Sequence, residues 1–407
     1  MNQHRFESKQ IELESADDLF KAGKFNEAEN LYIKILNEDP SNLIAITRLG
    51  HIALLANRLD DAQKWLTEAI RLKPDDPDPK SLLAEAFYRR DEFQQAAPLL
   101  HTIGREAKAR KLESFKDVSP YQIEGKAEVT NLKFVIIDPL PVVQVRVNNS
   151  ELVNFLIDTG GAEVIIDTEF AREIGAIQFG SVMGTFAGGK QASFQCGRVD
   201  SLTLGDFTIK NVPVDIMDVR RFRLGEMQPD GIIGTALLYH FLATLNYVEG
   251  QLTLRRRTEE NLRQVEREAR EQNAKIIPFW MAGDHYMVAW GTANNSQPML
   301  FFVDTGLAGG GFTCPESTLR EAGIKLQEER ARDGLGGGGM VRSIPFIVDT
   351  LTLDDATEHN IQGFYLGDDI EHRHGFRIGG IISHTFFRHY LLTFDFTGMR
   401  FFLKRQT

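Results

Sequence analysis

The sequence has little cysteine, no long apolar run and no excess of basic residues. Its two cysteines, Cys196 and Cys314, cannot form a disulfide framework, so we expect small buried thiols in a reducing compartment. No stretch approaches the ~20 apolar residues of a membrane-spanning helix. The polar segment 1–15 lacks the apolar centre of a secretory signal. These absences predict a cytoplasmic protein with no membrane partner.

The charge balance excludes further classes of protein. The chain carries 57 Asp and Glu against 46 Lys and Arg, which gives a net charge of −11 at pH 7. A nucleic-acid-binding surface would need a basic patch. The glycine runs lack the Lys-Ser/Thr pair of a phosphate-binding loop, and the histidines and cysteines do not have metal-ligand spacing. We therefore expect no nucleic-acid partner, no metal and no cofactor.

What is present begins with an internal repeat of 34 residues. Ala28, Ala62 and Ala96 recur at this interval. A small Ala lets two helices of a pair approach closely, and the apolar residues around it form a buried stripe. Three turn segments keep the same interval, and they are Gly23-Lys24-Phe25, Asn57-Arg58-Leu59 and Asp91-Glu92-Phe93. The period predicts paired helices that stack into an all-α array over residues 10–118.

This helical repeat resembles the tetratricopeptide family. The resemblance implies a surface that recruits a protein partner. The alternative is that the helices only support the part of the chain that follows them. The sequence does not identify a partner.

From residue 119 the pattern becomes β-rich, with short runs of β-branched residues separated by glycines, as in 142–147 and 207–218. The charged stretch 255–275 interrupts this pattern. It has strong helix formers and almost no apolar stripe, so it predicts an exposed linker helix. We expect this helix to separate two β-rich parts.

The β-rich part contains two copies of one unit. Asp158-Thr159-Gly160 returns 146 residues later as Asp304-Thr305-Gly306. Three more blocks recur at an offset of 149: VDSLTLGD with VDTLTLDD, GIIG with GIIS, and HFLATLNYVEGQLTL with HYLLTFDFTGMRFFL. We expect the three gained residues in the glycine runs of the second copy. The predicted boundaries are 119–254 for the first lobe, 255–273 for the charged helical linker and 274–407 for the second lobe.

A duplicated unit with one carboxylate in each copy can pack about a pseudo-two-fold axis and bring the two carboxylates together. Like charges at close range cannot both ionise, so the pair holds one proton. The ionised carboxylate can take a proton from water while the protonated one donates to a carbonyl oxygen. The sequence thus predicts general acid–base hydrolysis of an amide by Asp158 and Asp304.

Asp-Thr-Gly after an apolar strand, followed by GIIG and a short helix, resembles the pepsin and retropepsin-like aspartic proteases. The resemblance covers residues 121–407 and implies an all-β, bilobal acid-protease fold. It implies that Asp158 and Asp304 are catalytic. The supporting residues of the two loops would be Thr159, Gly160, Thr305 and Gly306. The substrate would be a protein or peptide.

The resemblance also implies two glycine-rich hairpins that cover the substrate as flaps. Their residues would be Ala187, Gly188, Gly189, Gly336, Gly337 and Gly338. Gly161 and Leu307 stand where pepsin-type enzymes usually carry Ser or Thr, and Ser383 stands where the family prefers Gly. Fewer hydrogen bonds to the ionised form raise the pKa of the aspartate pair, which predicts activity nearer neutral pH.

Two alternatives remain open beside a single-chain endopeptidase. The β-rich part could be a catalytically weak groove that binds peptides, with the repeats supplying a protein-interaction scaffold. The intact Asp-Thr-Gly in both copies argues against this alternative. Each lobe could also pair with another chain, as retroviral proteases do.

Overall fold

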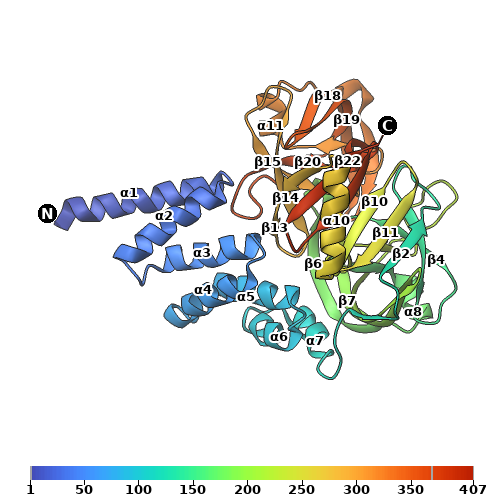
Figure 1. Ribbon diagram of the computed structural model, residues 1–407, viewed down its shortest axis with the longest axis horizontal. Coiled ribbons are helices and arrows are strands. Elements are labelled where there is room, and N and C mark those ends of the chain that lie inside the picture. Colours follow the sequence, from blue (N-terminus) through green and yellow to red (C-terminus); the bar gives the residue numbers. More distant parts are fainter. Residues whose placement is uncertain (1, 368–369, 407) are drawn as a thin grey trace.

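The computed structural model describes residues 2–367 and 370–406, and it has a helical array followed by a β-rich body (Figure 1). Residues 368–369 and 407 of the predicted second lobe lie outside the described part. The helices of the array are α1 (Asn2–Lys21), α2 (Phe25–Glu38), α3 (Leu43–Leu55), α4 (Leu59–Leu72), α5 (Pro77–Arg89), α6 (Phe93–Thr102) and α7 (Glu106–Glu113). They stack pairwise and extend away from the body on one side.

Local sequence signals explain where these helices begin and how they pair. The Asn42 side chain accepts a hydrogen bond from Ala45 N at the start of α3, and Asp76 with Pro77 starts α5. The three repeated alanines are fully buried, which allows the close approach predicted for the helix pairs. The turns within the pairs contain Gly23, Asn57 and Asp91, which all have a positive φ.

The first lobe is built around one sheet whose central strands carry the predicted site. Its order is β1-β8-β5-β9-β4-β3-β7-β6. The strands are β1 (Gln122–Glu124), β3 (Val142–Val147), β4 (Val153–Ile157), β5 (Val164–Asp167), β6 (Ile177–Phe186), β7 (Lys190–Leu204), β8 (Phe207–Met217) and β9 (Gly231–Ile233). Two short helices, α8 (Thr168–Glu173) and α9 (Thr235–Leu238), follow β5 and β9.

The second lobe repeats this arrangement. Its sheet has the order β13-β14-β15-β20-β16-β19-β18-β17, so that β14, β15, β20, β16 and β19 match β3, β4, β9, β5 and β8. The strands are β13 (Trp280–Ala282), β14 (Tyr286–Ala293), β15 (Met299–Val303), β16 (Phe312–Thr313), β17 (Arg332–Gly336), β18 (Gly339–Leu353), β19 (Ala356–Tyr365) and β20 (Ile378–Ile382). Helices α11 (Glu316–Glu321) and α12 (His384–Phe387) take the places of α8 and α9.

A third sheet joins the lobes and contains the pseudo-two-fold axis. Its order is β12-β22-β21-β10-β11-β2, and its strands are β2 (Val129–Lys133), β10 (Phe241–Asn246), β11 (Gln251–Arg256), β12 (Lys275–Pro278), β21 (Tyr390–Asp395) and β22 (Arg400–Arg405). Thr244 pairs with Thr393 at the centre of β10 and β21, and their hydroxyl oxygens lie 2.7 Å apart. These threonines are separated by the 149-residue offset. Equivalent residues therefore meet on the axis.

The sheet register also locates most of the length difference between the copies. Antiparallel pairing sets Ile165 opposite Ile232 in the first lobe and Thr313 opposite Ile381 in the second. The offset is therefore 148 at this strand, against 146 at the Asp-Thr-Gly loop. Two of the three gained residues lie in the segment Leu307–Gly311, one of the two predicted glycine runs.

The charged stretch between the lobes does form a helix, α10 (Glu259–Glu271), but the prediction that it is exposed was wrong for one face. Val265 and Ala269 are buried and pack against Leu242 and Phe402 of the joining sheet. Figure 1 shows α10 lying across β10, β11 and β22. These two apolar residues four positions apart, with Leu262 packed beside them, make this contact although charged residues surround them in the sequence.

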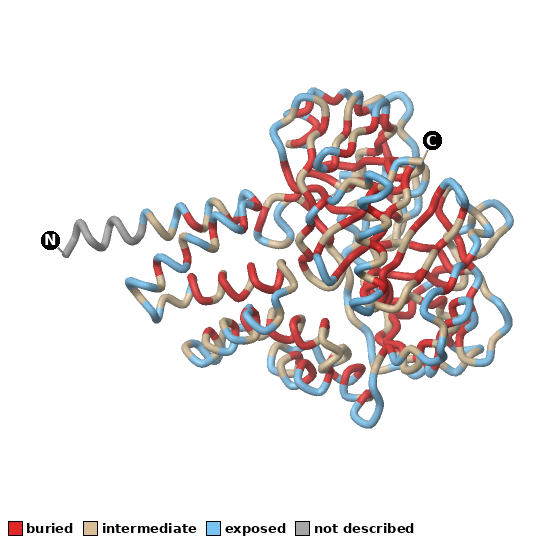
Figure 2. The backbone as a smooth tube through the Cα atoms, in the orientation of Figure 1, coloured by how far each residue is buried: buried red, intermediate tan, exposed pale blue. Residues whose placement is uncertain are grey.

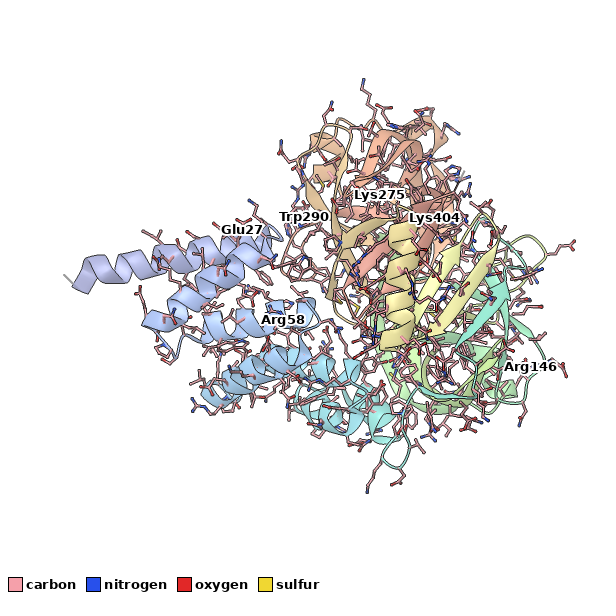
Figure 3. All side chains as sticks on the ribbon, viewed as in Figure 1. Glu27, Arg58, Arg146, Lys275, Trp290 and Lys404 are labelled. Atoms are coloured by element: carbon pink, nitrogen blue, oxygen red, sulfur yellow. The ribbon has the colours of Figure 1, made fainter. Side chains whose placement is uncertain are left out.

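The repeat array docks on both lobes through its turns. A Cβ on Gly23 would lie 2.5 Å from Leu300 Cδ1 of β15, and Trp290 of β14 is next to this turn (Figure 3). Asn57 Nδ2 donates to Tyr239 Oη and to the backbone oxygen of Phe396, at 3.1 Å each. The Asp91 carboxylate lies 3.1 Å from His240 Nε2 of the first lobe. The turn at Gly23 thus contacts the second lobe, the turn at Asn57 contacts both lobes, and the turn at Asp91 contacts the first lobe.

Buried side chains continue from the array into the body. One apolar cluster contains Leu54 and Phe87 of the repeats together with Phe155 of the first lobe and Phe301 of the second. Figure 2 shows buried segments on the inner helices and throughout the strands of both lobes. Within residues 2–367 and 370–406, no helix is long and apolar enough to span a bilayer.

We predict that Phe25→Ala destabilises the whole protein by about 3–5 kcal/mol. Phe25 is 1% exposed, and its ring lies 5.0 Å from Trp280 and 4.9 Å from Phe376 of the second lobe. Urea unfolding of the full chain measures the change. Ile33→Ala in the same helix is the control, because Ile33 is 45% exposed and should change stability by less than about 0.5 kcal/mol. Equal effects of both variants would contradict the docking contact.

Candidate active site

The two predicted catalytic aspartates follow equivalent strands. Asp158 comes directly after β4, and its backbone N–H donates to Ile233 O of β9 at 3.1 Å. Asp304 comes after β15, and its N–H donates to Ile382 O of β20 at 3.0 Å. The neighbouring strand thus fixes each loop in the same way. This symmetry follows from two repeated apolar sequences. One forms the strand before each Asp, β4 or β15, and the other, which contains GII, forms the neighbouring strand, β9 or β20.

The structure brings the two carboxylates together at the lobe interface. A Cβ on Gly160 would lie 2.3 Å from Asp304 Oδ2, and a Cβ on Gly306 would lie 2.1 Å from Asp158 Oδ1. Each carboxylate therefore lies over the glycine of the opposite loop, and no larger residue fits there. Within each loop the glycine N–H donates to its own aspartate Oδ1, at 2.8 Å for Gly160 and 2.7 Å for Gly306.

The environment of this pair favours a shared proton. Burial and then the adjacent Asp158 carboxylate raise the pKa of Asp304 well above its ordinary value. The N–H groups of Gly306 and Gly160 oppose this shift only in part. One ionised and one protonated carboxyl group can thus coexist here, as acid–base hydrolysis requires.

The predicted loop-supporting threonines form a reciprocal clamp across the axis. Thr159 N donates to Thr305 Oγ1 and Thr305 N donates to Thr159 Oγ1, at 3.0 Å each. The Thr159 hydroxyl donates onward to Val303 O at 3.1 Å, and the Thr305 hydroxyl donates to Ile157 O at 3.3 Å. Both threonines are fully buried. The clamp therefore links the backbone before each aspartate to the opposite lobe.

The two loops are supported from behind in different ways. In the first lobe a Cβ on Gly234 would lie 2.2 Å from Glu163 O, so this position requires glycine. In the second lobe the equivalent residue is Ser383, whose Oγ accepts a hydrogen bond from Leu307 N at 3.0 Å. The longer second loop leaves room for this hydroxyl. Ser383, in place of the glycine that the family prefers, thus adds a hydrogen bond to the second aspartate loop.

The predicted flap residues lie at the ends of two hairpins that meet each other. Ala187–Gly189 forms a single turn between β6 and β7, and Gly336 and Gly339 end β17 and begin β18. A Cβ on Gly337 would lie 2.2 Å from the Phe186 ring, and a Cβ on Gly338 would lie 2.8 Å from Lys190 O. The glycines therefore allow the two hairpin tips to touch.

Arg221 is a contact of these hairpins that the sequence did not reveal. Its guanidinium donates to Gly337 O and, at 3.3 Å, to Gly336 O. Arg221 belongs to the segment between β8 and β9 of the first lobe, so it holds the hairpin of the opposite lobe. No repeat or motif marks this arginine in the sequence.

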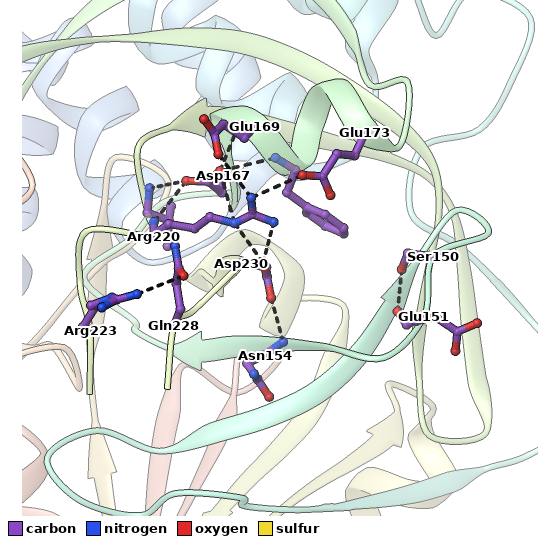
Figure 4. Close-up of polar contacts among 12 residues, drawn as sticks. Ser150, Glu151, Asn154, Asp167, Glu169, Glu173, Arg220, Arg223, Gln228 and Asp230 are labelled. Carbon is purple, nitrogen blue, oxygen red and sulfur yellow. Dashed lines mark hydrogen bonds and ion pairs between the residues drawn. The ribbon is translucent and has the colours of Figure 1, made fainter. Parts of the chain in front are cut away.

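A polar network anchors the segment that presents Arg221 (Figure 4). Asp167 is 2% exposed, caps α8, and accepts hydrogen bonds from the N–H groups of Val219 and Arg220 at 3.0 Å each. The Arg220 side chain bonds Asp230 Oδ1 at 3.0 and 3.1 Å, and Asp230 Oδ2 accepts from Asn154 N. The segment is thus fixed to β4, the strand before Asp158.

The structure places another unpredicted cluster behind the first aspartate loop. Glu163 is 5% exposed and contacts Lys111 of α7 and Tyr88 of α5. In the sequence, this cluster is signalled only by a charged residue five positions after Asp158. Among the described residues, no group of three His, Cys, Asp or Glu is placed to hold a metal ion.

Two segments of the chain match known families. Residues 143–237 match the aspartyl protease family model, and residues 19–85 match the tetratricopeptide repeat family model. The chain therefore carries an N-terminal tetratricopeptide array and a retropepsin-like aspartyl protease domain, which confirms both resemblances and the predicted fold class. The first match includes Asp158 and ends before the second Asp-Thr-Gly, which is related to the first by the structural equivalence of the two lobes.

We predict that Thr159→Val destabilises the protein by about 2–4 kcal/mol, because valine has the same shape but leaves Thr305 N and Val303 O unpaired in the interior. Urea unfolding measures this loss. Thr159→Ser is the matched control, since it keeps both hydrogen bonds. A valine variant as stable as the serine variant would contradict the role of the clamp.

We also predict that Asp304→Asn stabilises the protein at neutral pH. Because the pKa of Asp304 is raised in the folded state, its stabilising contribution is complete below the ordinary value of 3.8 and is lost as the pH rises through the folded value. Asparagine remains neutral and avoids this loss. As the pH rises, the free energy of unfolding of the variant should gain on that of wild type by at most about 1.4 kcal/mol per pH unit.

Urea unfolding of both proteins at several pH values between 3 and 8 tests this dependence. Asp349→Asn is the control, because Asp349 is exposed on β18, where its neighbours Val348 and Thr350 pair with Ile361 and His359 of β19. A constant difference between Asp304→Asn and wild type across this range would contradict a raised pKa.

Proposed function

Because an aspartyl protease domain follows tetratricopeptide repeats in this chain, we propose that it is an aspartic endopeptidase that cleaves peptide bonds in proteins or peptides. The observation that carries the proposal is the placement of Asp158 and Asp304 against each other's loops at the lobe interface. The reciprocal threonine clamp supports it, because acid–base catalysis needs carboxylates held in a fixed geometry.

The proposed reaction uses a water molecule between the two carboxyl groups. The ionised carboxylate takes a proton from this water as its oxygen attacks the substrate carbonyl carbon. The protonated carboxyl group donates to the carbonyl oxygen, and a tetrahedral intermediate forms without a covalent bond to the enzyme. As the intermediate collapses, the carboxyl group that took the water proton gives it to the amine nitrogen, the C–N bond breaks, and the other carboxylate takes back the proton from the hydroxyl group that becomes the carbonyl oxygen.

The substrate would be an extended peptide that lies between the aspartate pair and the two hairpins. Backbone hydrogen bonds along an extended strand are a common way to hold such a ligand. The touching hairpin tips and the Arg221 contact with Gly336 and Gly337 would have to separate for the peptide to enter. Glycine-rich turns suit this movement.

We propose a working pH near neutrality. Gly161 and Leu307 have no hydroxyl group to donate to an ionised aspartate, and burial raises the pKa of Asp304. We further propose that the enzyme is cytoplasmic. The repeats would recruit client proteins through the surface that the lobes leave free, since their turns already contact the body.

We predict that Asp158→Asn and Asp304→Asn each lower kcat/KM by about 10²–10⁴-fold, because either change removes one of the two acid–base groups. A peptide-library digest near pH 7, read by mass spectrometry, identifies a cleaved peptide for these measurements. Asp349→Asn is the matched control and should cleave like wild type.

The same digest separates the competing interpretations. Binding of library peptides without any cleavage would support a peptide-binding scaffold and overturn the endopeptidase. Robust turnover by either single variant would overturn the shared mechanism. Mass in solution measured beside activity addresses the third possibility, because an active monomer excludes lobes paired between chains.

A further inference from the structure

A buried ionic cluster connects the repeat array to the first aspartate loop. Lys111 of α7 is 1% exposed, and its Nζ lies 2.7 Å from Glu163 Oε1 and 3.1 Å from Asp215 Oδ1 of β8. Although burial opposes its charge, Asp215 and Glu163 raise the pKa of Lys111, so it stays protonated. A cation from the helical array thus neutralises acidic groups inside the protease lobe.

Two tyrosines complete the cluster, one from the repeat array and one from the start of the first lobe. The Tyr88 hydroxyl of α5 donates to Glu163 Oε1 at 2.9 Å, and the Tyr121 hydroxyl lies 3.3 Å from that of Tyr88. Glu163 Oε2 has no hydrogen-bond partner among the described residues. The Glu163 carboxylate therefore depends on groups that come from the repeat array.

Glu163 occupies the last position of the catalytic loop. Gly161 N donates to Asp158 O at 3.1 Å, and Ala162 O accepts from Ala236 N at 2.8 Å, so the chain between Asp158 and Glu163 is tightly bonded. Strand β5 begins at the next residue, and the Glu163 carbonyl packs against Gly234. A shift of Glu163 would consequently move the loop that carries Asp158.

The second lobe has neither acidic residue. The offset between the lobes rises from 146 to 148 along this loop, so the residue that matches Glu163 is one of Gly309, Gly310 and Gly311. This position therefore holds a glycine in the second lobe. The residue that matches Asp215 at the 149-residue offset is Phe364. The otherwise duplicated lobes thus differ at the place where the first lobe contacts Lys111 of α7.

We propose that Lys111 is a positioning residue, by which the repeat array holds the Asp158 loop in its catalytic geometry. This inference rests on the endopeptidase function proposed above. Without the ammonium group, the Glu163 side chain would lose the hydrogen bond that ties it to α7, and Asp215 would lose its buried cation, so the Glu163 end of the loop would shift. The repeat array is then part of the catalytic unit as well as a surface for clients.

Lys111→Met in the full chain tests the proposal against the peptide found in the library digest. We expect kcat to fall by about 10–100-fold, because a small displacement of a catalytic group is enough for such a loss. KM should change less than about threefold, since the groups that bind the peptide are unchanged. Lys111→Arg, which keeps the positive charge, should recover most of kcat.

Arg89→Met is the matched control. Arg89 is also a buried cation of the repeat helices, but it donates to Met281 O and Gly283 O of the second lobe and does not touch an aspartate loop. We expect it to lower stability and leave kcat within about twofold of wild type. A loss of kcat as large as that of Lys111→Met would show a general effect of loosened docking and overturn the proposal.

A second measurement does not depend on turnover. Hydrogen exchange of the full-length variants should show faster exchange in residues 159–163 of Lys111→Met, with no change in residues 305–309. Should Lys111→Met not fold, Glu163→Leu replaces it, because that variant removes the acceptor of Lys111 and Tyr88 and keeps the pair of Lys111 and Asp215. Unchanged kcat and unchanged exchange in whichever variant folds would overturn the inference.

The outcome remains separable from that of the proposed function. A wild-type protein that cleaves no peptide refutes the endopeptidase, and the exchange experiment then still decides whether Lys111 holds the loop. A wild-type enzyme that cleaves while Lys111→Met has unaltered kcat and exchange refutes only the positioning role.

Discussion

The whole site depends on the reciprocal hydrogen bonds between Thr159 and Thr305. Each threonine uses its hydroxyl group twice, to accept from the opposite backbone and to donate to it, so both hydroxyl groups are fully paired in the interior. This arrangement fixes the distance between the lobes. Two carboxylates can then be held against each other, although their charges repel and burial disfavours both.

Symmetry about one axis organises the rest of the body. Thr244 and Thr393 meet on the axis in the joining sheet, while the aspartate loops meet at the end of the equivalent strands β4 and β15. The site nevertheless lacks full symmetry. Ser383 bonds one loop from within its own lobe, whereas the other loop ends at Glu163, which Lys111 contacts from outside the lobe. The two aspartate loops therefore have different surroundings.

Features with a local or periodic signal could be predicted from the sequence. The 34-residue period marked the helices, and the repeated Asp-Thr-Gly with its co-linear blocks marked the two lobes, the aspartates and the threonines. Contacts between distant segments left no such signal. Lys111 lies in a short charged helix, Arg221 in an irregular segment, and only the folded chain brings them to Glu163 and Gly337. The exposure of α10 was mispredicted because Val265 and Ala269 are few among many charges.

The turn contacts of the array have a consequence for its length. Stacked repeats can usually be added or removed, because each one touches only its neighbours. Here Gly23, Asn57 and Asp91 each contact a different part of the lobes. The spacing of these contacts on the lobes therefore fits one number of repeat units. The loss or gain of one repeat unit between these turns would leave one turn without its contact on the lobes. A change in the number of repeat units between Gly23 and Asp91 therefore requires a matching change in the lobes.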